Sequence, residues 1–370
     1  MPLSKIIPAE YSSQLAEKAA RFKAEFAPFA LPEPALFASS PLSYRLRAEF
    51  RMWHQGEGGE RNERVDYAMF APENPRRPVV IDDFPIADAT IRAAMPRLRE
   101  LLQGNEILRR NLFQTEFLAT LSGELLITLI YHRRLDEAWE AAARALAAEL
   151  KVRLIGRSRR QKIVLDRDWV LEEFEFNGRH LRYQQIEASF SQPNGGVNRQ
   201  MLGWAFQQAG GLGGDLLELY CGNGNFTVAL APLFDRVLAT EVSKTSIQAA
   251  QYNLEANGIG NVTLVRMSSD EISAALAGER EFRRMEGIDL ERYRFSTLFV
   301  DPPRSGLDAP TLALAAGFEH ILYISCSQQS LHENVAALQA THDITAAAAF
   351  DQFPYTHHLE CGLLLTRRSC

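Results

Sequence analysis

The chain has 370 residues, a formal net charge of −6 at pH 7, and 46% hydrophobic residues. This length predicts two domains of ordinary size, and the hydrophobic content excludes a disordered chain. We expect a cytoplasmic protein, because no apolar run reaches the ~18 residues of a membrane span and no secretory signal opens the sequence. The four cysteines lack metal-ligand spacing, so we expect free thiols and no metal: Cys221, Cys326, Cys361 and Cys370.

The charge is unevenly distributed along the chain. Residues 186–370 hold 12 Lys and Arg against 20 Asp and Glu, whereas the first 185 residues hold 28 against 26. An RNA partner would therefore be bound mainly by the first half, although a difference of this size is also ordinary surface variation.

The first half reads as a helix followed by an α+β pattern. Apolar residues at helical spacing predict a helix over residues 9–30. Alternating apolar residues predict mainly antiparallel strands at 44–53, 65–71, 78–84 and, as a pair, within 117–132. Helices are expected at 87–102 and at 136–150, the second capped by Asp136, before two short strands and a hairpin that turns at Asn177-Gly178.

From about Gln192 onward, short apolar strands alternate with helices. This alternation predicts a Rossmann-like α/β domain, with a mostly parallel twisted sheet covered by helices on both faces. Two late strands, near 346–353 and 362–365, would complete the sheet. We therefore expect an N-terminal helical segment (1–40), an α+β domain (41–188) and the α/β domain (189–370).

The segment LLELYCGNGNF leads from a strand through a glycine turn into a helix. Gly222 and Gly224 allow a tight turn and a close approach to a ligand, and Glu241 ends the next strand, where a carboxylate can bind ribose hydroxyls. This layout serves dinucleotides and S-adenosylmethionine alike. The third glycine of the dinucleotide fingerprint is absent, which favours a methyltransferase. Asp301, held in the stiff Asp-Pro-Pro-Arg loop, ends a later strand.

Cys326 ends the following strand, and Glu360 precedes the last one. Carbon 5 of uracil becomes nucleophilic only after a thiolate adds to carbon 6, and a base must then remove the carbon-5 proton. This pair could supply both groups. A strand-end cysteine can instead be a small buried hydrophobe, the role we expect of Cys221 and Cys361.

Several motifs together resemble the RNA uracil-5-methyltransferases over essentially the whole chain: AEFRMWH, LFQTEFLATLS, FSQPN, LLELYCGNGNF, VDPPRSGLD, YISCS and DQFPYTHHLECG. The resemblance implies Cys326 as nucleophile and Glu360 as proton acceptor. It also implies contacts to S-adenosylmethionine from Gln192, Tyr220, Asn225, Glu241 and Asp301. The product would be 5-methyluridine in the T-loop of tRNA.

The resemblance points to the tRNA-acting branch. Relatives that act on ribosomal RNA can carry a cysteine-ligated iron–sulfur cluster and an extra N-terminal barrel. This chain has no cysteine before Cys221, so we expect no cluster. The first half would bind RNA as part of a monomer, with Arg51, Phe113 and His132 as candidates to stack on unpaired bases, unless Phe113 is core and Arg51 merely solvated.

Three other functions remain open from the sequence. The chain could methylate ribosomal RNA or act on both RNA classes. It could be an RNA-binding or RNA-folding protein that opens and re-forms the tRNA elbow. Cytosine-5 methylation uses the same thiol chemistry, but it needs an acid aimed at ring nitrogen 3, which the context of Gln192 does not favour.

Overall fold

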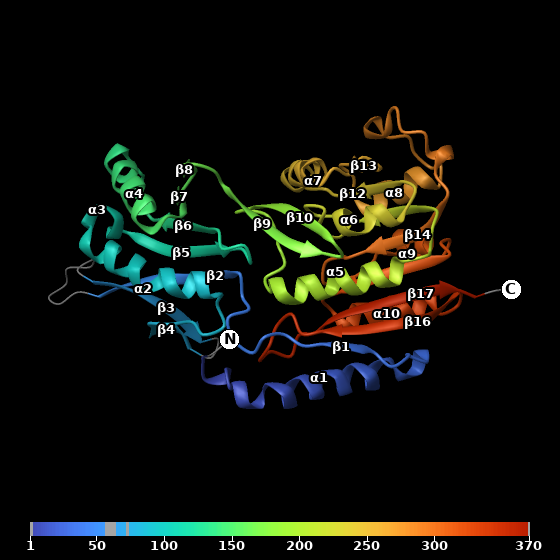
Figure 1. Cartoon of the computed structure of the whole chain (residues 1–370), viewed down its shortest axis with the longest axis horizontal. Helices are drawn as coiled ribbons and strands as arrows, with labels where there is room; N and C mark the ends of the chain where they lie inside the picture. Colours follow the sequence, from blue (N-terminus) through green and yellow to red (C-terminus); the bar gives the residue numbers. More distant parts are fainter. Residues whose placement is uncertain (1–2, 56–63, 72–73, 369–370) are drawn as a thin grey trace.

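The structure is a computed structural model that describes residues 3–55, 64–71 and 74–368. Two sheets lie at opposite ends of an elongated molecule, and a two-stranded hairpin lies between them (Figure 1). The first sheet comes from the first half of the chain. The second comes almost entirely from the second half.

The first sheet has seven strands in the order β4-β3-β2-β5-β6-β7-β8. The bounds are β2 (Arg47–Gln55), β3 (Arg64–Ala71), β4 (Asn74–Ile81), β5 (Leu112–Ala119), β6 (Leu125–Tyr131), β7 (Arg153–Ser158) and β8 (Gln161–Val164). All neighbouring strands are antiparallel except β6 and β7, which α4 (Glu137–Leu150) connects. α2 (Ala89–Gly104), α3 (Glu106–Arg109) and α4 cover one face.

The part of the helix-free face that β2 forms is polar, because β2 alternates along its length. Ala48, Phe50 and Met52 are buried in the core under the helices, whereas Glu49 and Arg51 between them are exposed on the other face. A sheet with one buried and one solvated face is typical of antiparallel strands. This open face is available to a partner.

Local sequence signals for the first half are confirmed. The Asp136 carboxylate accepts a hydrogen bond of 2.8 Å from the Trp139 backbone N–H and caps α4. Asn177 and Gly178 both have positive φ, 48° and 74°, as a type I′ turn requires. The helix expected over 9–30 is shorter, because α1 (Tyr11–Phe26) gives way to a 3-10 turn containing Pro28, which has no N–H to donate.

The second sheet has eight strands in the order β1-β16-β17-β15-β14-β11-β12-β13. The bounds are β1 (Ala35–Phe37), β11 (Asp215–Leu219), β12 (Val237–Thr240), β13 (Val262–Val265), β14 (Phe295–Val300), β15 (His320–Ser325), β16 (His342–Phe350) and β17 (Glu360–Arg367). The strands from β11 to β15 run parallel, and β17 is antiparallel to both of its neighbours.

Helices cover both faces of the second sheet, which confirms the Rossmann-like expectation. They are α5 (Gly195–Ala209), α6 (Asn225–Leu230), α7 (Lys244–Ala256), α8 (Ser269–Leu276), α9 (Ala309–Ala315) and α10 (Gln328–Leu338). One apolar core packs under α5 and α6, and another packs under α8, α9 and α10. No helix in the described ranges is long and apolar enough to cross a membrane.

Two segments from the first half of the chain also pack on the second sheet. α1 buries Phe22 and Phe26 in the core under α10, and β1 pairs in parallel with β16. The hairpin of β9 (Trp169–Phe176) and β10 (Arg179–Ile186) lies against α7, where its backbone N–H groups donate to Asn253 and Asn257. The hairpin thus links the open face of the first sheet to the second sheet.

Candidate functional site

A cavity of about 760 Å³ lies at the carboxyl ends of the parallel strands. β11, β12, β14 and β15 end at one edge of the sheet, so the residues that follow each strand meet there. The cavity brings together all seven residues expected to catalyse or bind the cofactor: Gln192, Tyr220, Asn225, Glu241, Asp301, Cys326 and Glu360.

The glycine turn after β11 leaves room for a ligand. Gly222 and Gly224 have φ of 57° and 80°, a region that side chains disfavour. A Cβ built on Gly222 would meet no atom within 4 Å, so the backbone there faces open space. Glu241 accepts hydrogen bonds from the N–H groups of Gly222 (3.2 Å) and Ser243 (2.7 Å). Its remaining lone pairs can accept from ribose hydroxyls, so this half of the cavity fits an adenosine-containing ligand.

Asn225 is held by a residue that the sequence reasoning missed. Its amide and that of Asn198 on α5 exchange two hydrogen bonds, of 2.9 and 3.0 Å. Tyr220 donates to the Ser269 hydroxyl at 2.7 Å. No sequence signal marked Asn198, because α5 also carries Arg199, Gln200, Gln207 and Gln208 and one more polar residue does not stand out.

Strand register sets the half of the cavity that contains Cys326 and Glu360. Ser325 on β15 pairs with Cys361 on β17, and Glu360 pairs with Phe350 on β16. Cys326 directly follows β15, and Glu360 is the first residue of β17. Because β15 and β17 are neighbours, the two residues lie at the same edge of the sheet. The Cys326 thiol is half-buried, and the Glu360 side chain is buried.

Burial and neighbouring carboxylates control the ionisation of this pair. Burial, then the charges of Glu360 and Asp301, raise the pKa of the Cys326 thiol to about 11. Burial, then Asp301, raises the pKa of Glu360 to about 8, and burial raises that of Asp301 to about 7. Arg304 opposes these shifts at Cys326 and Glu360. A carboxyl with a pKa near neutral is a stronger proton acceptor than an ordinary glutamate.

The coupling between these groups predicts a pH-dependent thiol reactivity. At about pH 9 most Glu360 side chains are ionised and oppose the thiolate, whereas at about pH 6.5 most are protonated. Iodoacetamide should alkylate Cys326 about three- to tenfold faster in the Glu360→Gln variant than in the unaltered chain at the higher pH. At the lower pH the two alkylation rates should be equal. Peptide mass spectrometry measures the extent of alkylation of the peptide that contains Cys326, separately from the other cysteines. If the variant and the unaltered chain had the same alkylation rate at both pH values, the coupling between Glu360 and the thiol would be contradicted.

The other described thiols do not share this setting. Cys221 and Cys361 are buried, and burial raises the pKa of each thiol well above its usual range. Cys370 lies outside the described residues. Among residues 3–55, 64–71 and 74–368, no group of three or more His, Cys, Asp or Glu side chains is placed to hold a metal ion.

The three expected RNA-binding residues form one stack on the first sheet. The Arg51 guanidinium carbon lies 3.7 Å from the centre of the Phe113 ring. On the other side, the His132 ring stacks with Phe113 at a centroid distance of 3.9 Å. Arg51 and His132 are exposed, and Phe113 is half-buried. Phe113 is therefore not part of the core, and the stack can present a ring or a guanidinium to a base.

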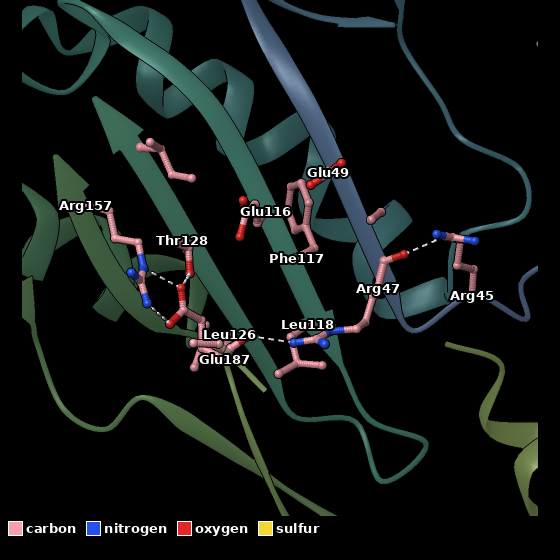
Figure 2. Close-up of a pocket in the computed structure, with 13 residues that line it drawn as sticks. Arg45, Arg47, Glu49, Glu116, Phe117, Leu118, Leu126, Thr128, Arg157 and Glu187 are labelled. Carbon is pink, nitrogen blue, oxygen red and sulfur yellow. Dashed lines mark hydrogen bonds and ion pairs between the residues drawn. The ribbon is translucent and has the colours of Figure 1, made fainter. Parts of the chain in front are cut away.

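Two further hollows lie between this stack and the cavity at the strand ends. One, of about 540 Å³, lies on the open face, where Arg157 and Glu187 point toward one another and bond at 2.7 Å (Figure 2). Ala188 lines both this hollow and the cavity at the strand ends. Ile130 and Arg157 also line a third hollow, together with Phe113, His132, Arg133, Arg134, Arg159 and Arg160. The three hollows therefore share lining residues in turn from the stack to the cavity that contains Cys326. The excess of arginines lies at the stack end, whereas Glu49, Glu116 and Glu187 line the middle hollow.

Comparison with known proteins identifies the family. A family model described as tRNA (Uracil-5-)-methyltransferase matches residues 10–368. The chain belongs to this family. A protein of Aromatoleum aromaticum named tRNA/tmRNA (uracil-C(5))-methyltransferase is 74% identical, with coverage of 100% of this chain and 98% of the relative. A Dechloromonas aromatica protein of the same name is 68% identical, with both chains covered fully.

A solved structure supports the fold of this family member. The tRNA (uracil-54, C5)-methyltransferase of Pyrococcus abyssi, solved with S-adenosyl-L-homocysteine, aligns with a TM-score of 0.72. The alignment covers 96% of this chain and 83% of that one, at 19% identity. The two-sheet architecture is therefore shared despite divergent sequences.

Proposed function

We propose that this chain transfers a methyl group from S-adenosylmethionine to carbon 5 of a uridine in the T-loop of tRNA, acting as a monomer. The chain is a tRNA uracil-5-methyltransferase by family. The observation that carries the rest is the placement of the Cys326 thiol and the Glu360 carboxyl in one cavity, beside the glycine turn and Glu241. Gln192, Tyr220, Asn225, Glu241 and Asp301 would hold the cofactor.

The chemistry begins at Cys326. Its thiolate adds to carbon 6 of uracil, and the electron pair of the 5,6 double bond moves toward carbon 5 and oxygen 4. S-adenosylmethionine supplies the electrophilic methyl group. Carbon 5 forms the new bond to that methyl group while the sulfur–methyl bond breaks with its electron pair left on sulfur, so S-adenosylhomocysteine departs. The ring is then saturated at carbons 5 and 6 and covalently attached to Cys326.

Glu360 completes the reaction. Its carboxylate takes the proton from carbon 5, the double bond re-forms, and the carbon 6–sulfur bond breaks with its electron pair returning to Cys326. The raised pKa of Glu360, about 8, suits it to accept this proton near neutral pH. The thiol, with a pKa of about 11, must first release its own proton to solvent, and only the ionised fraction attacks carbon 6.

The substrate position is tested by locating the methyl group. With labelled S-adenosylmethionine and an unmodified tRNA transcript, we expect label only in 5-methyluridine of the T-loop. A transcript whose T-loop target uridine is replaced by cytidine should stay unlabelled. tmRNA and 23S rRNA fragments serve as competing substrates. Label outside the T-loop, or in ribosomal RNA alone, would contradict the proposal.

We propose that residues 41–188 bind the tRNA through the open face of the first sheet, with Arg51, Phe113 and His132 as base-stacking residues. Base–aromatic stacking contributes about 1–3 kcal/mol per base. Phe113 carries Arg51 and His132 on its two faces, so Phe113→Ala, which removes the support of both, should weaken tRNA binding by about 5- to 150-fold. Affinity for S-adenosylhomocysteine should not change, since Phe113 lies outside that cavity. Filter binding measures the first quantity and calorimetry the second. Unchanged tRNA affinity would remove Phe113 from the RNA-binding surface.

A further inference from the structure

The hollow beside the base-stacking residues gathers positive charge. It measures about 1020 Å³, and five arginines line it: Arg133, Arg134, Arg157, Arg159 and Arg160. None of the described residues that line it is an aspartate or a glutamate. The chain as a whole has a formal net charge of −6, so this local excess is opposite in sign to the balance of the molecule. A concave surface lined by one sign of charge attracts ligands of the other sign, here anions.

Two of the five arginines are already engaged by the protein. Arg133 donates to the backbone carbonyls of Ile107, Arg110 and Arg134, and Arg157 forms its ion pair with Glu187. The other three, Arg134, Arg159 and Arg160, are exposed. Within the described residues, no hydrogen bond or ion pair engages their guanidinium groups. These three groups are therefore available to a ligand.

The amide of Gln161 ties together the two loops that carry the three available arginines. Arg159 and Arg160 form the two-residue turn between β7 and β8, because Ser158 pairs directly with Gln161. The Gln161 Oε1 accepts from the backbone N–H of Leu135, and its Nε2 donates to the Leu135 carbonyl, each at 2.9 Å. Leu135 is the neighbour of Arg134 in the chain. The amide thus holds the loop after β6 against the β7–β8 turn, and the three guanidinium groups surround one hollow.

The base-stacking residues form another wall of this hollow, because Phe113 and His132 also line it. A nucleotide whose base stacks there would carry its phosphates toward the arginines. Guanidinium groups match the geometry of a phosphate and can bind it through two parallel hydrogen bonds. We propose that Arg134, Arg159 and Arg160 form a phosphate-binding site for the RNA backbone next to the stacked base. This inference rests on the proposed binding of tRNA by the first sheet.

The salt dependence of RNA binding tests the inference. Each phosphate contact on a single strand contributes about 0.7 to the slope of log affinity against log salt concentration. In the double variant Arg159→Ala with Arg160→Ala, the slope should therefore be shallower by about 1.4. Binding of a T-arm RNA should weaken about 25-fold at about 0.1 M salt, and the difference should vanish toward about 1 M. A damaged fold would instead weaken binding at every salt concentration.

The matched control is Arg280→Ala with Arg283→Ala, which removes the same charge from exposed residues in the second half of the chain. Its slope should equal that of the unaltered chain. Gln161→Leu keeps all five arginines but releases the loop after β6, so we expect about two- to tenfold weaker binding, the cost of ordering one side chain.

An unchanged slope in the Arg159, Arg160 double variant would overturn the inference. So would an equal loss of slope in the control, which would mean that only the total charge matters, or unaltered affinity in Gln161→Leu. The proposed function fails separately, as absence of T-loop label from the unaltered chain, a result that leaves the difference in slope standing.

Discussion

The Glu360→Gln variant is expected to transfer one methyl group and then remain covalently attached to its tRNA through Cys326. Glutamine cannot accept the carbon-5 proton, and the carbon 6–sulfur bond cannot break until that proton leaves. General-base catalysis contributes about 10²- to 10⁴-fold, so multiple turnover should fall by that factor. A denaturing gel with label in the methyl group should show a protein–RNA band approaching one tRNA per protein.

The double variant Cys326→Ala with Glu360→Gln is the matched control, because it removes the nucleophile and leaves the amide. It should form no stable band while still binding tRNA. A Glu360→Gln protein that turns over at the normal rate would exclude Glu360 as the proton acceptor. A labelled tRNA that migrates freely after a single turnover would exclude the covalent route.

The Cys326→Ala variant should lose methylation by more than about 10⁴-fold, because without the thiol carbon 5 of uracil is not a nucleophile. Binding of tRNA and of S-adenosylhomocysteine should persist, since neither depends on a bond to sulfur. Rates come from incorporation of labelled methyl groups into a tRNA transcript. A protein whose purpose is to refold tRNA would keep that activity in this variant, which separates the two functions.

Cys221→Ala is the matched control for Cys326→Ala, because Cys221 also lines the cavity but is buried, with a thiol pKa raised well above the usual range. We expect its turnover to stay within a few-fold of normal. If Cys221→Ala abolished turnover and Cys326→Ala did not, the nucleophile would be misassigned.

Local patterns predicted the elements of this fold well because their causes are local. The Asn177-Gly178 turn and the Asp136 cap depend only on nearby backbone and were placed correctly. The alternation of strands and helices predicted the parallel sheet, and the sheet then brought Glu241, Asp301 and Cys326 to one edge. Strand-end residues can thus be assembled into a site before any coordinates are known.

Long-range pairings could not be predicted, since no local pattern encodes which distant surface a segment will meet. β1 pairs with β16, aligning Ala35 with Ala348. Buried Lys18 of α1 donates to Asp351 at 2.7 Å. Gln192 was assigned only through the family resemblance, and its buried partner Gln352 was missed because an amide in a loop carries no periodic signal.

The most direct test of the account is the mass of the peptide that contains Cys326, after the Glu360→Gln variant has reacted with tRNA and S-adenosylmethionine and the RNA has been digested. We predict that this peptide carries one nucleotide of methylated uridine, derived from the T-loop. An unmodified Cys326 peptide alongside free 5-methyluridine, or a nucleotide attached to another residue, would contradict it.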